Sequence, residues 1–87
     1  MTFLDGNELA APLREIFTVD LTVASGQCAN CGRRCTLAEV RLYARAPELV
    51  ARCTGCEAVL LRLVRSPDRV WLDLSGLSYL EIARPPD

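Results

Sequence analysis

Apolar residues near the start of the chain recur at the spacing of one helical face, at Leu9, Leu13, Ile16 and Phe17. This pattern predicts one N-terminal helix over residues 4–17. Asp5 stands where a helix cap is expected, and Glu8 follows three positions later, which is the spacing of a capping box. Pro12 has no backbone N–H to donate. We therefore expect either a kink at Pro12 or a short turn followed by a helix that begins near it.

The period of the apolar positions then changes from that of a helix to two. Alternation over residues 17–23 predicts a half-buried strand that leads into the first cysteines. Residues 36–45 also alternate, and Val40 and Tyr43 favour a strand over a helix there. The sequence APE that follows predicts a turn, and residues 49–53 predict a short return strand.

The last third of the chain predicts a β-hairpin. Residues 59–64 are apolar at nearly every position, which is typical of a strand that is covered on both faces. Residues 66–69 carry the signals of a turn, with proline in second position. Residues 70–74 complete the hairpin, and residues 75–82 predict either a short helix or an edge strand.

These elements predict a small mainly-β fold, with an antiparallel sheet of about five strands and one N-terminal helix. Residues 1–87 contain no linker or long repeat, so we expect a single domain. Within it, the helix at 4–17 precedes a cysteine-containing region at 18–58 and a C-terminal hairpin with a terminal segment at 59–82. A chain of 87 residues is short for an unaided hydrophobic core, so we expect a metal, disulfides or a partner chain to stabilise it.

The chain contains five cysteines and no histidine. Four of the cysteines form two C-x2-C pairs, Cys28 with Cys31 and Cys53 with Cys56. Two intervening residues let a tight turn direct both sulfurs at one ion, and two such turns place four sulfurs at a tetrahedron about 2.3 Å from zinc. Gly32 supports this interpretation, because the residue after such a turn often needs a positive φ. The spacing predicts one zinc ion held by four thiolates.

Other interpretations of the cysteines stay open. Iron also suits a tetrahedral site of four thiolates, which would make the chain a rubredoxin-like electron carrier. The odd number of cysteines disfavours a disulfide framework. Cys35 is expected to pack as a small apolar residue, although Arg33 and Arg34 beside it leave a reactive thiol as the alternative.

The motif CANCG resembles the knuckle of the zinc-ribbon family, which reads C-x2-C-G. The second motif, CTGCE, departs from the family at Thr54, where proline is common, and at Glu57, where glycine is common. This departure bears on the local geometry of the second knuckle more than on its ligation. The segments LDGNELAAPLREIFTVD and YARAPELVARCTGC, with the ending LLRLVRSPDRVWLDLSGLSYL, are similar to a small actinobacterial family of uncharacterised single-zinc-ribbon proteins. The resemblance covers nearly the whole chain and implies the fold, whereas the family has no assigned activity. Its one hint about partners is a redox enzyme, beside which the chain would be an accessory subunit.

The net charge of −1 argues against general nucleic-acid binding, which normally needs a basic excess. Arg33 and Arg34 are expected to balance the negative charge of a four-thiolate site. The alternative is a nucleic-acid-binding ribbon, in which the arginines track phosphates. Tyr43, close to Arg41 and Arg45, supplies the aromatic residue that such a surface uses for stacking.

The start of the chain does not resemble a secretory signal, and no apolar stretch approaches the ~20 residues of a membrane span. We therefore expect a cytoplasmic protein. No histidine, paired carboxylates or glycine-rich phosphate loop supports an enzyme, so we expect a non-catalytic zinc-binding protein that acts as a protein-interaction or accessory subunit. Apolar residues make up 51% of the chain. Either the N-terminal helix covers one face and the terminal segment covers the other, or strand 59–64 and Trp71 dock a protein partner or a second copy of the chain.

Overall fold

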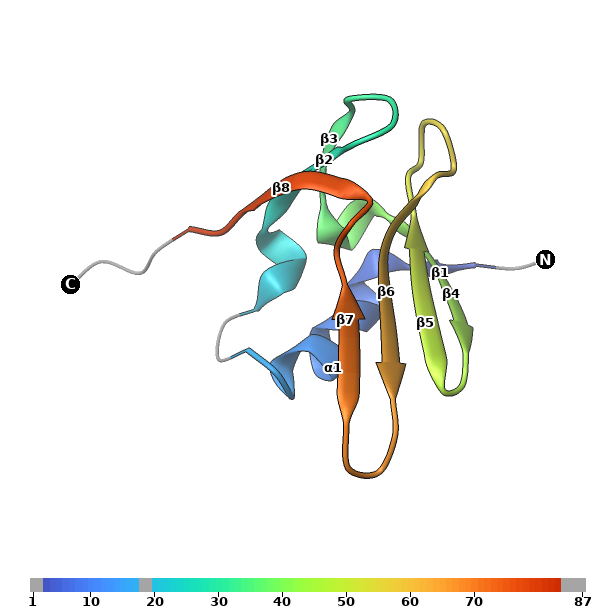
Figure 1. The fold of residues 1–87 in the computed structure, drawn as a ribbon. Coiled ribbons are helices and arrows are strands. Elements are labelled where there is room, and N and C mark those ends of the chain that lie inside the picture. Colours follow the sequence, from blue (N-terminus) through green and yellow to red (C-terminus); the bar gives the residue numbers. More distant parts are fainter. Residues whose placement is uncertain (1–2, 18–19, 84–87) are drawn as a thin grey trace.

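The computed structural model describes residues 3–17 and 20–83 (Figure 1). It contains a five-stranded antiparallel sheet with the order β1-β4-β5-β6-β7, and a three-stranded antiparallel sheet with the order β3-β2-β8. The strands are β1 (Leu4–Asp5), β2 (Ser25–Cys28), β3 (Arg34–Thr36), β4 (Arg41–Arg45), β5 (Glu48–Arg52), β6 (Val59–Arg65), β7 (Val70–Asp73) and β8 (Leu77–Glu81). The predicted mainly-β class, with a five-stranded sheet and one N-terminal helix, is confirmed; the second sheet was not predicted.

The N-terminal helical segment is shorter than the predicted 4–17. After β1, a 3-10 turn, η1 (Gly6–Leu9), leads directly into the α-helix α1 (Ala10–Arg14). The Asp5 carboxylate accepts a hydrogen bond from the Asn7 N–H at 2.9 Å, which confirms the predicted cap. Pro12 is the third residue of α1, where a backbone N–H has no partner within the helix. Of the two expectations, a turn followed by a helix that begins near Pro12 is therefore confirmed.

The strand predicted over residues 17–23 is wrong where the structure describes it. Leu21–Val23 forms a 3-10 turn, η2, and residues 18–19 of the predicted strand lie outside the described residues. The cause is Asp20, whose carboxylate accepts hydrogen bonds from the Thr22 N–H at 3.0 Å and the Thr22 hydroxyl at 2.6 Å. Such a local side-chain bond offers the backbone an alternative to a strand ladder.

The long strand predicted at 36–45 is divided in two. The 3-10 turn η3 (Leu37–Glu39) separates β3 from β4, and the Leu37 side chain is buried. At Gly6, a Cβ atom would overlap the Leu37 carbonyl oxygen, so glycine lets η1 pack closely against η3. The predicted return strand is confirmed as β5, which pairs with β4 across a turn at residues 46–47.

The C-terminal hairpin is confirmed as β6 and β7, but β6 is irregular. Ala51 lies opposite Leu61 while Arg52 lies opposite Val59, so Leu60 is an extra residue in the ladder. A bulge of this kind lets Leu60 and Leu61 both point inward, and both are buried. The apolar run therefore reflects a bulge rather than two covered faces, and the exposed Arg62 shows that the outer face is open.

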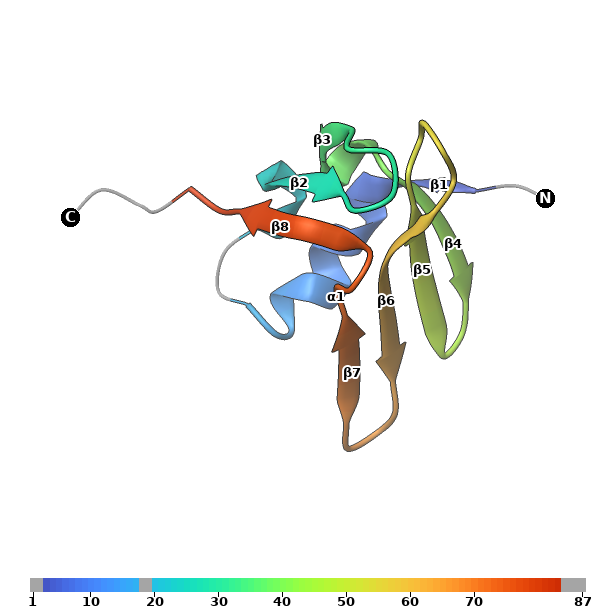
Figure 2. The ribbon, with the colours of Figure 1, turned by 45° about the horizontal axis from the view of Figure 1, so that its top comes forward.

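Residues 75–82 form an edge strand, β8, rather than a helix, and β8 pairs with β2. The chain crosses from the five-stranded sheet to the three-stranded sheet between β7 and β8 (Figure 2). At Gly76, a Cβ atom would overlap the Val59 carbonyl oxygen, so the crossing passes directly against the start of β6.

One hydrophobic core connects the two sheets and the helical segments. Figures 1 and 2 show α1 on one face of the five-stranded sheet, with the other face open. The fully buried leucines are Leu9, Leu13, Leu21, Leu37, Leu42, Leu60, Leu61 and Leu63. Three cysteines, Cys28, Cys35 and Cys53, belong to the same buried cluster. No helix in the described residues has the length and apolar character needed to cross a membrane.

Candidate metal centre

The two C-x2-C pairs lie on two different sheets. Cys28 is the last residue of β2 and Cys31 lies in the connection from β2 to β3, whereas Cys53 and Cys56 lie in the connection between β5 and β6. Both views show these two connections side by side at one end of the molecule (Figures 1 and 2). A metal ion held by both pairs would therefore link the three-stranded sheet to the five-stranded sheet.

The two connections have the same backbone hydrogen bonds. In the first, the Gly32 N–H donates to the Cys28 carbonyl and the Cys28 N–H donates to the Arg33 carbonyl, both at 2.9 Å. In the second, the Glu57 N–H donates to the Cys53 carbonyl and the Cys53 N–H donates to the Ala58 carbonyl, again at 2.9 Å. The matching offsets define two equivalent knuckles.

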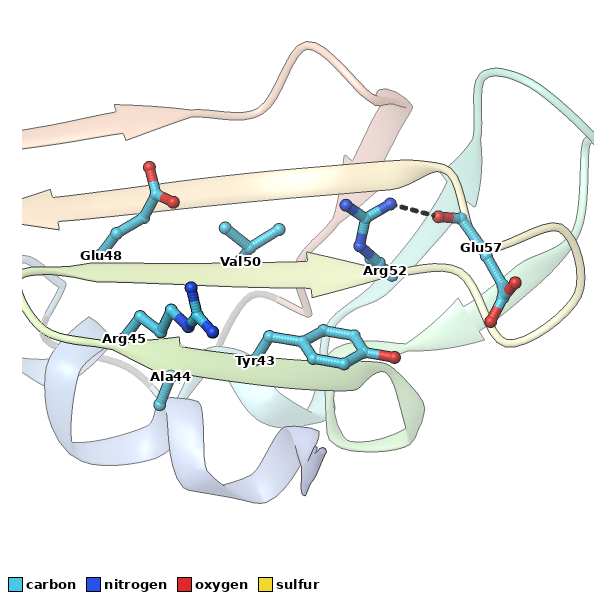
Figure 3. Close-up of a pocket in the computed structure, with 7 residues that line it drawn as sticks. All are labelled: Tyr43, Ala44, Arg45, Glu48, Val50, Arg52 and Glu57. Carbon is cyan, nitrogen blue, oxygen red and sulfur yellow. Dashed lines mark hydrogen bonds between the residues drawn. The ribbon is translucent and has the colours of Figure 1, made fainter. Parts of the chain in front are cut away.

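Both knuckles end on a residue with a left-handed backbone. Gly32 has φ of 80° and Glu57 has φ of 65°. Glu57 is the position at which the second motif departs from C-x2-C-G, and the departure leaves the knuckle geometry unchanged. Two arginines hold Glu57: Arg52 donates to its carbonyl oxygen at 2.9 Å, and Arg41 lies 3.3 Å from its carboxylate (Figure 3 shows the first contact).

The four sulfurs form a compact cluster. All lie within 4.8 Å of one another, with Cys28 and Cys56 at 3.6 Å and Cys31 and Cys53 at 3.7 Å. A tetrahedron with metal–sulfur bonds of about 2.3 Å has edges of about 3.8 Å, whereas a disulfide bond measures about 2.05 Å. These two sulfur–sulfur distances match the tetrahedral edge, and the donor set is one that zinc and iron both accept. The four cysteines therefore fit a metal ion, and all five cysteines of the chain are free thiols.

Hydrogen bonds around the sulfurs favour the thiolate form that a metal requires. The Asn30 side chain donates to the Cys56 sulfur at 3.4 Å, and this bond, with a backbone bond from Ala58, lowers the pKa of Cys56 to about 6. The Gly55 N–H donates to the Cys53 sulfur at 3.3 Å, and the pKa of Cys53 is also lowered, because backbone bonds and the Cys31 thiol outweigh burial. Asn30 was not singled out in the sequence, because an asparagine inside a knuckle has no distinguishing pattern.

The pKa of the Cys31 thiol is shifted in the opposite direction. The Arg33 backbone bond lowers the pKa of Cys31, but burial and the three neighbouring sulfurs outweigh it and raise that pKa to about 11. Neighbouring thiolates repel one another, so a positive charge between the sulfurs would favour their ionised form. A divalent metal supplies that charge and deprotonates a coordinating thiol outright.

The cluster has a buried side and an open side. Cys28 and Cys53 are buried, whereas Cys56 is half-buried and Cys31 is exposed. Cys35 lies outside the cluster: it pairs with Gly26 between β2 and β3, its side chain is buried, and burial raises the pKa of its thiol. The structure thus places Cys35 in the core, as the sequence predicted.

The arginines beside the knuckles have partners of their own. Arg34 lies 3.6 Å from the Glu81 carboxylate, with its guanidinium 5.6 Å from the centre of the Tyr79 ring. The expected compensation of the cluster's charge by Arg34 is therefore replaced by a contact between β3 and β8. The side chain of Arg33 runs past Gly55, where a Cβ atom would meet it at 3.1 Å, so Arg33 does border the second knuckle.

A groove that the sequence did not predict lies on the open face of the five-stranded sheet (Figure 3). Its volume is about 490 Å³, and it is lined by Tyr43, Ala44, Arg45, Glu48, Val50, Arg52 and Glu57. Arg52 and Glu57 place one end of the groove next to the second knuckle. The alternating residues of β4 and β5 were the available signal, but the pairing of Tyr43 with Val50 depends on a register that periodicity does not specify.

Comparison with known proteins adds a family but no activity. No curated protein and no solved structure matches the chain. Residues 1–85 match DUF6510, a family of unknown function. The match spans nearly the whole chain, including both knuckles and β8. With its two knuckles and four clustered thiols, the chain belongs to the DUF6510 family.

Proposed function

We propose that this chain is a non-catalytic zinc-binding protein that acts as a protein-interaction or accessory subunit. One observation carries the proposal: two knuckles with matching hydrogen bonds bring four cysteine sulfurs within 4.8 Å of one another. A zinc ion held by Cys28, Cys31, Cys53 and Cys56 has no open coordination position, so it does not activate a water molecule. Its contribution is to the folding free energy, on the order of 10–16 kcal/mol for structural zinc.

The position of the cluster supports a structural role for the ion. The knuckles link two sheets that share one core, and Cys28 and Cys53 are part of that core. Without a cation, the cluster leaves sulfurs whose charges oppose one another next to buried leucines. We therefore assign the metal a structural role, in which it fixes the relative placement of the two sheets.

Iron is the competing occupant, because four thiolates in a tetrahedron suit it as well. The exposed Cys31 gives the cluster the solvent-facing edge that an electron carrier uses. Metal analysis of the protein purified from its own cells in iron-replete medium separates the two. One zinc per chain and no visible absorbance supports the structural proposal, whereas a coloured protein with one iron overturns it.

Native mass spectrometry of the endogenous protein tests the accessory role. We expect a complex whose mass exceeds that of two zinc-loaded chains, so that it contains a different protein, and this component identifies whether the partner is a redox enzyme. A matched sample in which Trp71→Ser is expressed at the same level serves as the control, because Trp71 is the most exposed aromatic side chain in the described residues. A zinc-loaded monomer without any partner contradicts the accessory role while leaving the zinc site intact.

A second candidate, nucleic-acid binding, is favoured by three arginine–aromatic pairs on the surface. Arg34 lies over Tyr79, Arg41 over Phe3 and Arg52 over Tyr43, with distances to the ring centres of 5.6, 5.0 and 5.9 Å. Guanidinium groups beside exposed rings are the components of a single-strand binding surface. Retention on a heparin column that falls with rising salt supports this candidate, and elution in the void volume at low salt rejects it.

A further inference from the structure

Strand β7 forms a free edge of the five-stranded sheet. It stands last in the strand order and pairs only with β6. The β6–β7 hairpin projects beyond the rest of the sheet (Figures 1 and 2). Two large apolar residues of β7, Val70 and Trp71, are 43% and 53% exposed. A free edge with exposed apolar side chains is a template for pairing with another strand.

The hydrogen-bond pattern shows which backbone groups of β7 face this edge. At the turn, the Ser66 N–H donates to the Arg69 carbonyl at 2.8 Å, so these two residues form a hydrogen-bonded pair. Hydrogen-bonded and non-hydrogen-bonded pairs alternate along an antiparallel ladder. The backbone N–H and C=O groups of Trp71 therefore bond to β6. Those of Val70 and Leu72 point away from β6, toward the free edge.

The neighbouring ladder gives the same result independently. The Arg65 N–H donates to the Pro47 carbonyl at 3.1 Å, toward β5. Because successive residues of a strand direct their backbone groups to opposite sides, those of Val64 face β7. Val64 is paired with Trp71, so this agrees with the pattern inferred from the turn. In the described residues, no hydrogen bond satisfies the outward backbone groups of Val70 or Leu72. The free edge of β7 thus offers two backbone N–H donors and two backbone C=O acceptors, at alternate residues as in any antiparallel ladder.

We propose that two copies of this chain pair antiparallel along β7, about a two-fold axis at Trp71, and join their five-stranded sheets into one continuous sheet. In this register, the outward backbone N–H and C=O groups of Val70 bond to those of Leu72 in the second copy. By symmetry, those of Leu72 bond to Val70 of the second copy. Trp71 lies opposite Trp71 of the second copy as a non-hydrogen-bonded pair, in which the side chains approach most closely. The occupant of the edge is a second copy because β7 is complementary to itself.

Charge fixes the register. Arg69 lies opposite Asp73 of the second copy, and this pair occurs twice by symmetry, once on each side of Trp71. Because side chains alternate along a strand, Arg69, Trp71 and Asp73 share the open face of the sheet. Moving the axis to Leu72 would place Trp71 opposite Asp73 and Arg69 opposite Ser75, which loses both ion pairs and the aromatic pair. In the described residues, Arg69 makes no other ion pair.

The sequence predicted an interaction surface made of strand 59–64 and Trp71, whereas the proposed dimer uses β7 alone. Strand 59–64 places Leu60, Leu61 and Leu63 in the core, so it leaves little apolar surface for a partner. Within the β6–β7 hairpin, the large apolar side chains that are exposed are Val70 and Trp71. This inference rests on the proposed interaction role, but the two fail separately. A zinc-loaded chain that stays monomeric removes the dimer and leaves the structural zinc site standing.

Sedimentation velocity of the full zinc-loaded chain over a concentration series tests the charge pairing. We expect a monomer–dimer equilibrium for the wild type and an increase of about tenfold or more in the dimer Kd for Arg69→Asp. The variant loses two attractive cross-strand pairs and gains two repulsive ones. Arg45→Asp is the matched control, because it makes the same charge change on β4, at the far side of the same sheet. We expect its Kd to equal that of the wild type.

A second pair of variants tests the backbone bonds directly. Val70→Pro removes an N–H that faces away from β6, so the hairpin keeps its own ladder while the dimer loses two hydrogen bonds. Val70→Ala removes the same side chain but keeps the N–H, and we expect it to dimerise measurably better than the proline variant. Zinc content and circular dichroism identify a variant that has not folded. Three results would overturn the proposal. The wild type could remain monomeric at about 0.5 mM, or the dimer Kd could be unchanged by both Arg69→Asp and Val70→Pro. The third is that β7 pairs with a strand of a different protein.

Discussion

At the residue scale, the metal centre depends on which cysteines the knuckles bring together. The sequence predicted all four clustered cysteines, because the C-x2-C spacing is a local property that does not depend on the rest of the fold. It also predicted a buried Cys35. It did not predict the contact of Asn30 with Cys56, since that contact joins residues from different knuckles and sheets.

Substitution of single cysteines separates ligands from core residues. We expect Cys31→Ser to lose its zinc to a competing chelator that leaves the wild type with one ion per chain, because one of four thiolates is missing. Cys35→Ser is the matched control: it should keep one zinc per chain. Burying a hydroxyl without a partner should lower its free energy of unfolding by about 1–3 kcal/mol. Equal zinc loss in both variants would contradict the assignment of the cluster.

Substitutions of the left-handed residues Gly32 and Glu57 should change the free energy of unfolding in opposite directions. Gly32 has φ of 80° and open space around it, so Gly32→Ala should cost about 1 kcal/mol of unfolding free energy through backbone conformation alone. Glu57 has the same left-handed conformation but carries a side chain. Glu57→Gly and Glu57→Ala both remove the carboxylate, so they differ only in the Cβ atom. We expect the glycine variant to be more stable than the alanine variant by about 0.5–1 kcal/mol, because glycine relieves the backbone strain. Denaturant unfolding at saturating zinc measures both differences. A Glu57→Gly variant less stable than Glu57→Ala would contradict the left-handed geometry.

At the element scale, the differences between prediction and structure have local or long-range causes. Alternation at 17–23 resembles a strand, but the Asp20 carboxylate bonds to Thr22 and forms a turn instead. Alternation at 36–45 continues through Leu37, where packing of η1 against η3 bends the chain. The pairing of β2 with β8 joins distant parts of the sequence, so periodicity alone does not reveal the three-stranded sheet.

The bulge in β6 gives this strand a test of its own. If β6 were regular, Leu60 would face the open side of the sheet, as Arg62 does. Because the bulge turns Leu60 inward and buries it fully, Leu60→Ala should lower the free energy of unfolding by about 2–5 kcal/mol, as Leu61→Ala should. Val64→Ala, on the open face of the same strand, should cost less than about 1 kcal/mol. A Leu60→Ala variant as stable as Val64→Ala would show that β6 has no bulge.

At the scale of the whole molecule, the knuckles join two sheets that are linked in sequence by short connections. The proposed zinc ion contributes about 10–16 kcal/mol, which is comparable to the whole net stability of a typical domain, ~5–15 kcal/mol. Chelation of the metal should therefore unfold the whole chain cooperatively, with loss of near-ultraviolet circular dichroism and of dispersed amide signals. Readdition of zinc should restore both. A chain that keeps its native spectrum after complete metal removal would show that the core alone holds the sheets together.

We propose that four cysteine thiolates hold one zinc ion between the two sheets. X-ray absorption spectroscopy at the metal edge of the purified protein measures the metal, the type of its ligands and their distances together. We expect a zinc edge with a single shell of four sulfurs at about 2.3 Å. A zinc shell that contains nitrogen or oxygen, or an iron edge, would contradict it.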